Sequence, residues 1–140
     1  WVIANTHLPV ILKGILHPAD AQKALDHGVS GIIVSNHGGR IVDTTIPPLI
    51  ALQKIRAIVP PDYPVLLDGG IRRGTDVFKA IALGANAVLI GRPYIYGLAV
   101  AGALGAAHVI RILKEEFEIT MALMGTATIN EINQDYIYQN

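Results

Sequence analysis

The sequence contains no cysteine and has no excess of charge of either sign. Its 140 residues include 11 Lys and Arg against 11 Asp and Glu. Without cysteine the chain forms no disulfide, no thiolate metal site and no cysteine nucleophile. Without a basic excess it lacks the charge that neutralises phosphates, so we expect no bulk binding to nucleic acid. The five histidines form no pair at metal-ligand spacing, so we expect no metal site.

Charged residues are also scarce, at 16% of the chain against 51% hydrophobic residues. This composition excludes a disordered chain, and the length predicts a single domain. Residues 93–110 hold no Asp, Glu, Lys or Arg and approach the length of a membrane-spanning helix. The stretch is rich in Ala and Gly rather than Leu, so we interpret it as a segment packed tightly against a sheet, not as a membrane span.

Four short apolar runs predict strands, at residues 9–12, 31–34, 65–67 and 87–90. None alternates apolar with polar residues, which is typical of parallel strands covered on both faces. Helical spacing of apolar residues follows each run, at residues 18–27, 46–59, 75–83 and 103–124. Strand and helix therefore alternate four times, which predicts an α/β fold with a parallel sheet.

Four such units are half of a (β/α)8 barrel, which usually needs about 250 residues. A four-stranded parallel sheet alone would expose both edge strands and leave its inner face partly uncovered. The pattern also starts abruptly at Trp1. We therefore expect residues 1–140 to be the C-terminal half of a barrel domain, with closure of the ring by two chains as the alternative.

Polar and glycine-rich residues follow each predicted strand. They are Lys13-Gly14 after the first, residues 35–40 after the second, residues 68–74 after the third and residues 91–93 after the fourth. The carboxyl ends of parallel strands meet at one edge of the sheet, where barrels and open α/β sheets place their sites. We expect the four segments to form one site.

The last two of these segments predict a phosphate site. Their glycines let backbone N–H groups approach a ligand, and the positive end of the helix that follows residue 74 faces the same spot. Arg72, Arg73 and Arg92 add guanidinium groups that match phosphate oxygens. The alternative is a pair of tight turns with arginines facing solvent.

The segment after the second strand is the candidate for chemistry. His37 can take or give a proton near neutral pH, and Arg40 can hold a carboxylate with two parallel hydrogen bonds. Together they suit removal of a proton or hydride from the carbon next to a carboxylate. The alternative is a structural histidine hydrogen-bonded inside a glycine turn.

Lys13 ends an apolar run, where a charge needs an anion. Three interpretations stay open for it. Its ammonium could stabilise an electron-rich cofactor ring, form a Schiff base with a substrate, or make a salt bridge with Asp68.

Several of these stretches together resemble one family. LPVILKGI, GIIVSNHGGR, VLLDGGIRRGTDVFKAIALGA, VLIGRPYIYGLA and EEFEITMALMG are similar to the FMN-dependent α-hydroxy acid oxidases and dehydrogenases, the family of glycolate oxidase, lactate oxidase and flavocytochrome-type lactate dehydrogenase. The resemblance implies a (β/α)8 TIM barrel, of which about the last four βα units are present. It also implies FMN as cofactor and oxidation of an L-2-hydroxy acid to the 2-oxo acid, with electrons passing to oxygen or another acceptor.

The resemblance also implies a role for each site residue. His37 matches the catalytic base and Arg40 the residue that holds the substrate carboxylate, with His37 beside it. Lys13 matches the residue that stabilises the reduced flavin, and Ser35 a flavin contact. The residues implied to hold the ribityl chain and phosphate are Asp68, Gly69, Gly70, Ile71, Arg72, Gly91 and Arg92. Residues 41–43 read Ile-Val-Asp where the family usually has Gln-Leu-Asp, so the preferred acid stays open.

The same resemblance implies that the family's first four βα units carry further flavin contacts, substrate-binding tyrosines and the Asp that orients the catalytic His. We therefore expect no turnover from these 140 residues alone. The alternative is a non-catalytic half-barrel that binds FMN or phosphate and needs a partner half. For the complete protein we expect a homo-oligomer. The C-terminal residues 138–140 are not a peroxisomal tripeptide, so we expect a cytoplasmic protein, with the peroxisome open for a eukaryotic source.

Overall fold

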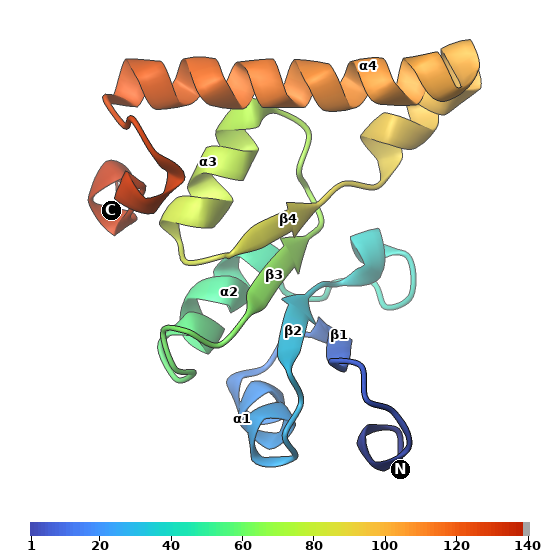
Figure 1. Ribbon diagram of the computed structural model, residues 1–140, viewed down its shortest axis with the longest axis vertical. Helices are drawn as coiled ribbons and strands as arrows, with labels where there is room; N and C mark the ends of the chain where they lie inside the picture. Colours follow the sequence, from blue (N-terminus) through green and yellow to red (C-terminus); the bar gives the residue numbers. More distant parts are fainter. Residues whose placement is uncertain (139–140) are drawn as a thin grey trace.

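The computed structural model describes residues 1–138 and contains four parallel strands, each followed by an α-helix (Figure 1). The strands pair in the order β1-β2-β3-β4. This confirms the predicted α/β fold with a parallel sheet. The elements are β1 (Ile11–Ile15), α1 (Pro18–Asp26), β2 (Gly31–Val34), α2 (Pro48–Arg56), β3 (Val65–Asp68), α3 (Gly74–Ala82), β4 (Ala87–Leu89) and α4 (Arg92–Met124), with short 3-10 turns that include η2 (His37–Gly39).

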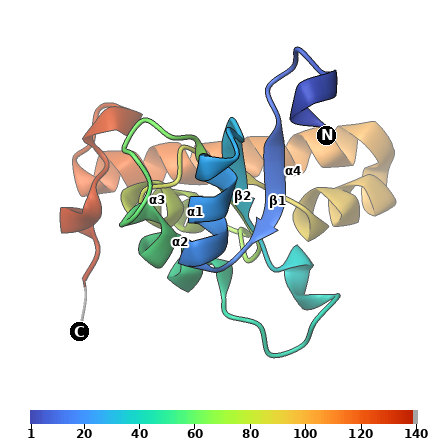
Figure 2. The same cartoon turned by 90° about the horizontal axis from the view of Figure 1, so that it is seen from below.

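One face of the sheet is covered and the other is open. Helices α1, α2 and α3 lie along the same side of the strands (Figures 1 and 2). Alternate strand residues that face these helices are completely buried: Ile32, Val34, Val65 and Leu67. Ile33 and Leu66, which pair across β2 and β3, belong to the opposite face and are only half-buried. This one-sided covering is what the sequence predicts for half of a barrel.

The edge strand β1 starts later and runs further than predicted. It covers Ile11–Ile15 instead of residues 9–12, so Lys13 lies inside the strand rather than at its end. The strand is predicted from an apolar run, which ends before Lys13. Lys13 can nevertheless continue the strand because the Asp68 carboxylate lies beside its ammonium group. Ile11 and Leu12 remain 45% and 41% exposed, as expected for an edge strand that pairs with a neighbour on one side only.

Helix α2 is shorter than the predicted 46–59. It begins at Pro48, directly after Pro47, and ends at Arg56. Proline is favoured in the first turn of a helix because its missing N–H has no intrahelical partner there. Ile58 and Val59 leave the helix before the Pro60-Pro61 pair, while Val59 still packs into the core.

Helix α4 is longer than the predicted 103–124 and is broken near its start. It begins at Arg92, but Ala101 and Gly102 have non-helical backbone angles, with φ +59° at Gly102. The two segments meet at Gly97 and Gly105, where a Cβ on Gly105 would overlap the carbonyl oxygen of Gly97. Figure 1 shows the first segment turned away from the axis of the second. Glycine at these positions permits both the break and the close approach.

By length and composition, α4 is the one helix among residues 1–138 that passes the test for a membrane span. The break interrupts it, and the second segment carries charged side chains that include Arg111, Lys114 and Glu118. The expectation that residues 93–110 pack tightly against the sheet is wrong for the described chain, because none of these residues is buried. The first segment packs against the second instead.

Candidate active site

The four strand-end segments converge on one cleft of about 670 Å³ at the carboxyl ends of the strands. Figure 2 shows the arrowhead of β1 and the loop after β2 at the same edge of the sheet. All the side chains and glycines assigned a role at the site, except Ser35 and Arg73, line this cleft: Lys13, His37, Arg40, Asp68, Gly69, Gly70, Ile71, Arg72, Gly91 and Arg92. The apolar part of the wall includes Ile41 and Pro93, which lie in segments that the sequence places at the site. Sequence reasoning missed the rest of this apolar wall, which consists of Leu89, Ile90, Tyr94 and Ile95. Apolar residues next to a strand carry no signal that separates a cleft wall from a core.

Ser35 lies completely buried behind the cleft wall. Its hydroxyl oxygen accepts one hydrogen bond from Lys13 Nζ at 2.8 Å and another from the backbone N–H of His37 at 3.1 Å. Ser35 therefore positions two other site residues. Its direct contact with a flavin stays a prediction.

Lys13 forms a salt bridge with Asp68, which is one of the three roles considered for it from the sequence. Its Nζ lies 2.7 Å from Asp68 Oδ2 and also donates to Ser35. Lysines that form Schiff bases are typically activated by apolar or cationic surroundings. Lys13 has an anion beside it instead, which argues against the Schiff-base interpretation and keeps a positive charge at the cleft.

The other carboxylate oxygen of Asp68 is the unusual polar atom of the site. Oδ1 is buried and has no hydrogen-bond partner within the described residues. A buried acceptor without a partner costs free energy, so such an atom needs an explanation. Because Asp68 lines the cleft, a hydroxyl group of a bound ligand is a suitable donor for it.

The segment after β2 folds tightly around His37. His37 has φ +55°, a conformation uncommon outside glycine, and the Asn36 side chain accepts a hydrogen bond from the Gly38 N–H. Arg92 Nη2 donates to the Gly38 carbonyl oxygen at 2.9 Å, which ties this segment to the one after β4. The side chains of Ser35, Asn36 and Arg92 hold the backbone of this turn. The exposed imidazole is therefore not needed to hold it and faces the same cleft as Arg40.

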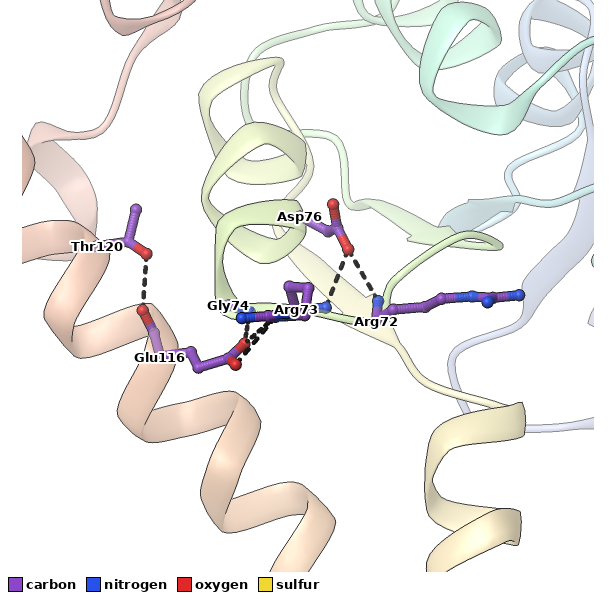
Figure 3. Close-up of polar contacts among 6 residues, drawn as sticks. All are labelled: Arg72, Arg73, Gly74, Asp76, Glu116 and Thr120. Atoms are coloured by element: carbon purple, nitrogen blue, oxygen red, sulfur yellow. Dashed lines mark hydrogen bonds and ion pairs between the residues drawn. The ribbon is translucent and has the colours of Figure 1, made fainter.

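The two adjacent arginines of the third segment diverge. Figure 3 shows Arg72 extending away from Glu116, whereas Arg73 turns toward Glu116 and pairs with it, with Nε and Oε1 3.0 Å apart. Arg72 lines the cleft and Arg73 does not. The prediction that Arg73 adds charge to the phosphate site is therefore wrong, because its guanidinium serves the contact between α3 and α4.

The start of α3 is already neutralised by carboxylates. The backbone N–H groups of Arg72 and Arg73 donate to Asp76 at 3.0 and 2.9 Å, and that of Gly74 donates to Glu116 at 2.8 Å (Figure 3). The prediction that the N-terminus of α3 helps to bind a phosphate is therefore wrong. Anion binding is left to the cleft-lining glycines and arginines of the two loops.

Acidification is expected to weaken the contact between α3 and α4. The hydrogen bond from the Gly74 N–H lowers the pKa of Glu116, with Arg73 adding to the effect. A lowered pKa means that Glu116 contributes stability above the ordinary pKa of glutamate and loses it as the pH falls through the folded-state value. Urea midpoints of the chain and of Glu116→Gln should differ at neutral pH and converge in acid.

Glu118→Gln is the matched control, since the exposed Lys114 is the one ion-pair partner of Glu118 within residues 1–138. It should shift the urea midpoint little at any pH. A difference between the chain and Glu116→Gln that stays constant from neutral to acid pH would contradict this role of Glu116.

Residues 1–139 match the family described as FMN-dependent dehydrogenase, and the chain belongs to that family. It is 56% identical over 98% of its length to a peroxisomal (S)-2-hydroxyacid oxidase of Arabidopsis thaliana. It is 54% identical over 97% of its length to an L-lactate oxidase of Roseobacter, and 46% identical over 98% to the glycolate oxidase of Spinacia oleracea.

Solved structures of a mandelate oxidase are similar over 92% of the chain, with a TM-score of 0.89 and 50% identity. The chain spans 37–38% of the length of those sequence relatives and 39% of the mandelate oxidase chain. The fold described above is therefore part of the larger barrel seen in these relatives.

The residues of the cleft fit the FMN of this family. FMN carries ribityl hydroxyls, a phosphate and a ring that becomes electron-rich on reduction, and the cleft offers one complementary feature for each. Asp68 Oδ1 is a buried acceptor with no hydrogen-bond partner among residues 1–138. Gly70 and Gly91 border open space, since a Cβ on either would meet nothing within 4 Å, and Arg72 and Arg92 line the same cleft. Lys13 supplies the remaining positive charge.

Proposed function

We propose that this chain is the C-terminal half of an FMN-dependent barrel enzyme that oxidises an L-2-hydroxy acid to the 2-oxo acid. The observation that carries the proposal is the convergence of His37, Arg40 and the FMN-compatible residues on one cleft. A base, a carboxylate clamp and a cofactor cradle are the parts this reaction needs. Relatives named as oxidases of lactate, glycolate and 2-hydroxyacids support the substrate class.

The cofactor would be held by groups that now face the cleft. Asp68 Oδ1 would accept a hydrogen bond from a ribityl hydroxyl, and Arg72 and Arg92 would bind the phosphate together with backbone N–H groups next to Gly70 and Gly91. Lys13 would lie at the ring. FMN, when bound, supplies the acceptor for the two electrons that leave the substrate.

The substrate would be bound and deprotonated by the segment after β2. Arg40 would hold the carboxylate with two hydrogen bonds and so fix the neighbouring carbon next to His37. His37 would accept the hydroxyl proton if the hydrogen on the carbon leaves with its electron pair as a hydride. Alternatively, His37 would accept the carbon-bound proton, and the electron pair left on the carbon would then pass to FMN while the hydroxyl group releases its own proton. In either case the imidazole stores one proton while two electrons leave the substrate.

The complete active site requires more than these residues. The half-buried face of β2 and β3 and the exposed edge of β1 are surfaces that a closed barrel would cover. We propose that the remainder of the barrel precedes this half in the same protein, that the full-length protein forms a homo-oligomer, and that oxygen or another acceptor takes the electrons. The chain alone would not turn over. A half-barrel that binds FMN without catalysis is the second candidate.

The cellular location also stays a proposal. The plant relative is named as peroxisomal. The tripeptide on which the cytoplasmic expectation rests includes Gln139 and Asn140, which lie outside the described residues.

A paired substitution tests the phosphate cradle. In the full-length protein, Arg72→Met should weaken FMN binding about 10- to 100-fold, because a hydrogen bond to a charged group contributes about 1.5–3 kcal/mol. The affinity for riboflavin, which lacks the phosphate, should not change. Flavin fluorescence quenching measures both affinities.

The adjacent Arg73→Met is the matched control, since Arg73 pairs with Glu116 outside the cleft. It should change FMN affinity by less than about threefold, as expected for an exposed ion pair. Equal losses for the two variants, or an equal loss of riboflavin and FMN affinity in Arg72→Met, would contradict the assignment.

A further inference from the structure

We propose that Gly14 is a positioning residue for His37, because a bulge in β1 at Gly14 creates the space in which the imidazole lies. The inference rests on the proposed function, in which His37 is the base. It assigns a role to a glycine on a different strand from the histidine that it serves.

The first observation is the bulge itself. Lys13 pairs with Ile33 of β2 and Ile15 pairs with Val34, so Gly14 is an extra residue on β1 with no partner across the ladder. Its φ is +100°, which L side chains rarely adopt. Bulges of this kind re-aim side chains next to functional sites.

The second observation is the distance to the imidazole. A Cβ built on Gly14 would lie 2.8 Å from His37 Nε2, 3.6 Å from Cε1 and 3.8 Å from Cδ2. Ordinary van der Waals contact needs 3.4 Å or more. A methyl group at position 14 would therefore displace the ring, and the displaced edge is the one that carries a proton-accepting nitrogen.

The backbone of His37 cannot easily follow such a displacement. Its N–H donates to the buried Ser35 hydroxyl, and the next carbonyl, of Gly38, accepts from Arg92. The ring must therefore turn while the backbone stays. Reacting groups misplaced by about 1 Å lose about a hundredfold in rate, so a rotation of the base is sufficient to slow catalysis.

The test compares Gly14→Ala with Gly28→Ala in the FMN-loaded full-length protein. Gly28 also has a positive φ, +71°, but a Cβ there would meet nothing within 4 Å. Both variants carry backbone strain, and only the first meets the imidazole. Gly14→Ala should lower kcat about a hundredfold, with FMN affinity unchanged, and should shift the imidazole NMR signals of His37. Gly28→Ala should leave kcat and those signals as in the parent protein.

A double-mutant cycle keeps the test independent of activity and of full folding. Removing the imidazole removes the clash, so Gly14→Ala should lower the urea midpoint less in a His37→Ala background than in the parent protein. Recovery of folding in the double variant supports the proposal if Gly14→Ala alone fails to fold. Equal losses in both backgrounds, or unshifted His37 signals in a folded Gly14→Ala, would overturn it. Full activity of His37→Ala would instead overturn the proposed function and leave the cycle valid.

Discussion

Replacing His37 with alanine is expected to slow reduction of the bound flavin by about a thousandfold, within the range that a positioned general base contributes. His37 is exposed in the cleft, and its ring does not hold the surrounding turn, whose hydrogen bonds come from Ser35, Asn36 and Arg92. The variant should therefore fold and keep its FMN. Anaerobic stopped-flow mixing with a 2-hydroxy acid measures the rate of reduction.

His108→Ala is the matched control, because His108 is exposed on α4 and does not line the cleft. It should reduce the flavin at the parent rate. Reduction by His37→Ala within tenfold of the parent rate would favour the non-catalytic half-barrel or a different base.

Gly74→Ala is expected to destabilise the protein by about 3 kcal/mol, at the upper end of the cost of overpacking. Gly74 begins α3 where α4 crosses it, and a Cβ there would overlap the backbone nitrogen of Phe117. Backbone atoms cannot rotate away as a side chain can, so the two helices must separate. That movement also removes the hydrogen bond between the Gly74 N–H and Glu116. Urea unfolding measures the loss.

Gly91→Ala is the comparison for stability. Gly91 also stands next to the start of a helix, but a Cβ there would meet nothing within 4 Å. In the absence of FMN it should change the free energy of unfolding by less than about 0.5 kcal/mol. Similar unfolding curves for Gly74→Ala and Gly91→Ala would show that α3 and α4 do not depend on this close approach.

The sequence predicts the site better than it predicts the details of the elements around it. The order of the strands requires that Lys13, His37, Asp68 and Arg92 meet, because each lies near the carboxyl end of a parallel strand or directly after it, and these ends share one edge of the sheet. That prediction uses only the pattern of strands and helices. It is confirmed by the cleft that these residues line.

The pattern of strands and helices does not predict contacts between side chains that are far apart in the sequence. Adjacent arginines look alike in a sequence, and the difference between Arg72 and Arg73 arises from Glu116, which lies 43 residues beyond Arg73. The same carboxylate accepts a hydrogen bond from the Gly74 N–H at the start of α3. A glycine in an apolar run also gives no sign that it forms a bulge. The closeness of the His37 ring to position 14 is therefore visible only in the structure, where the two strands lie side by side.

We propose that this cleft belongs to an enzyme that transfers electrons from an L-2-hydroxy acid to FMN. The most direct measurement is the visible absorbance of the FMN-loaded full-length protein, mixed anaerobically with glycolate, L-lactate or L-mandelate, with D-lactate as the control. We predict that at least one of the first three acids bleaches the oxidised flavin in a single turnover and that D-lactate does not. A protein that binds FMN stoichiometrically and is bleached by none of them would contradict the account.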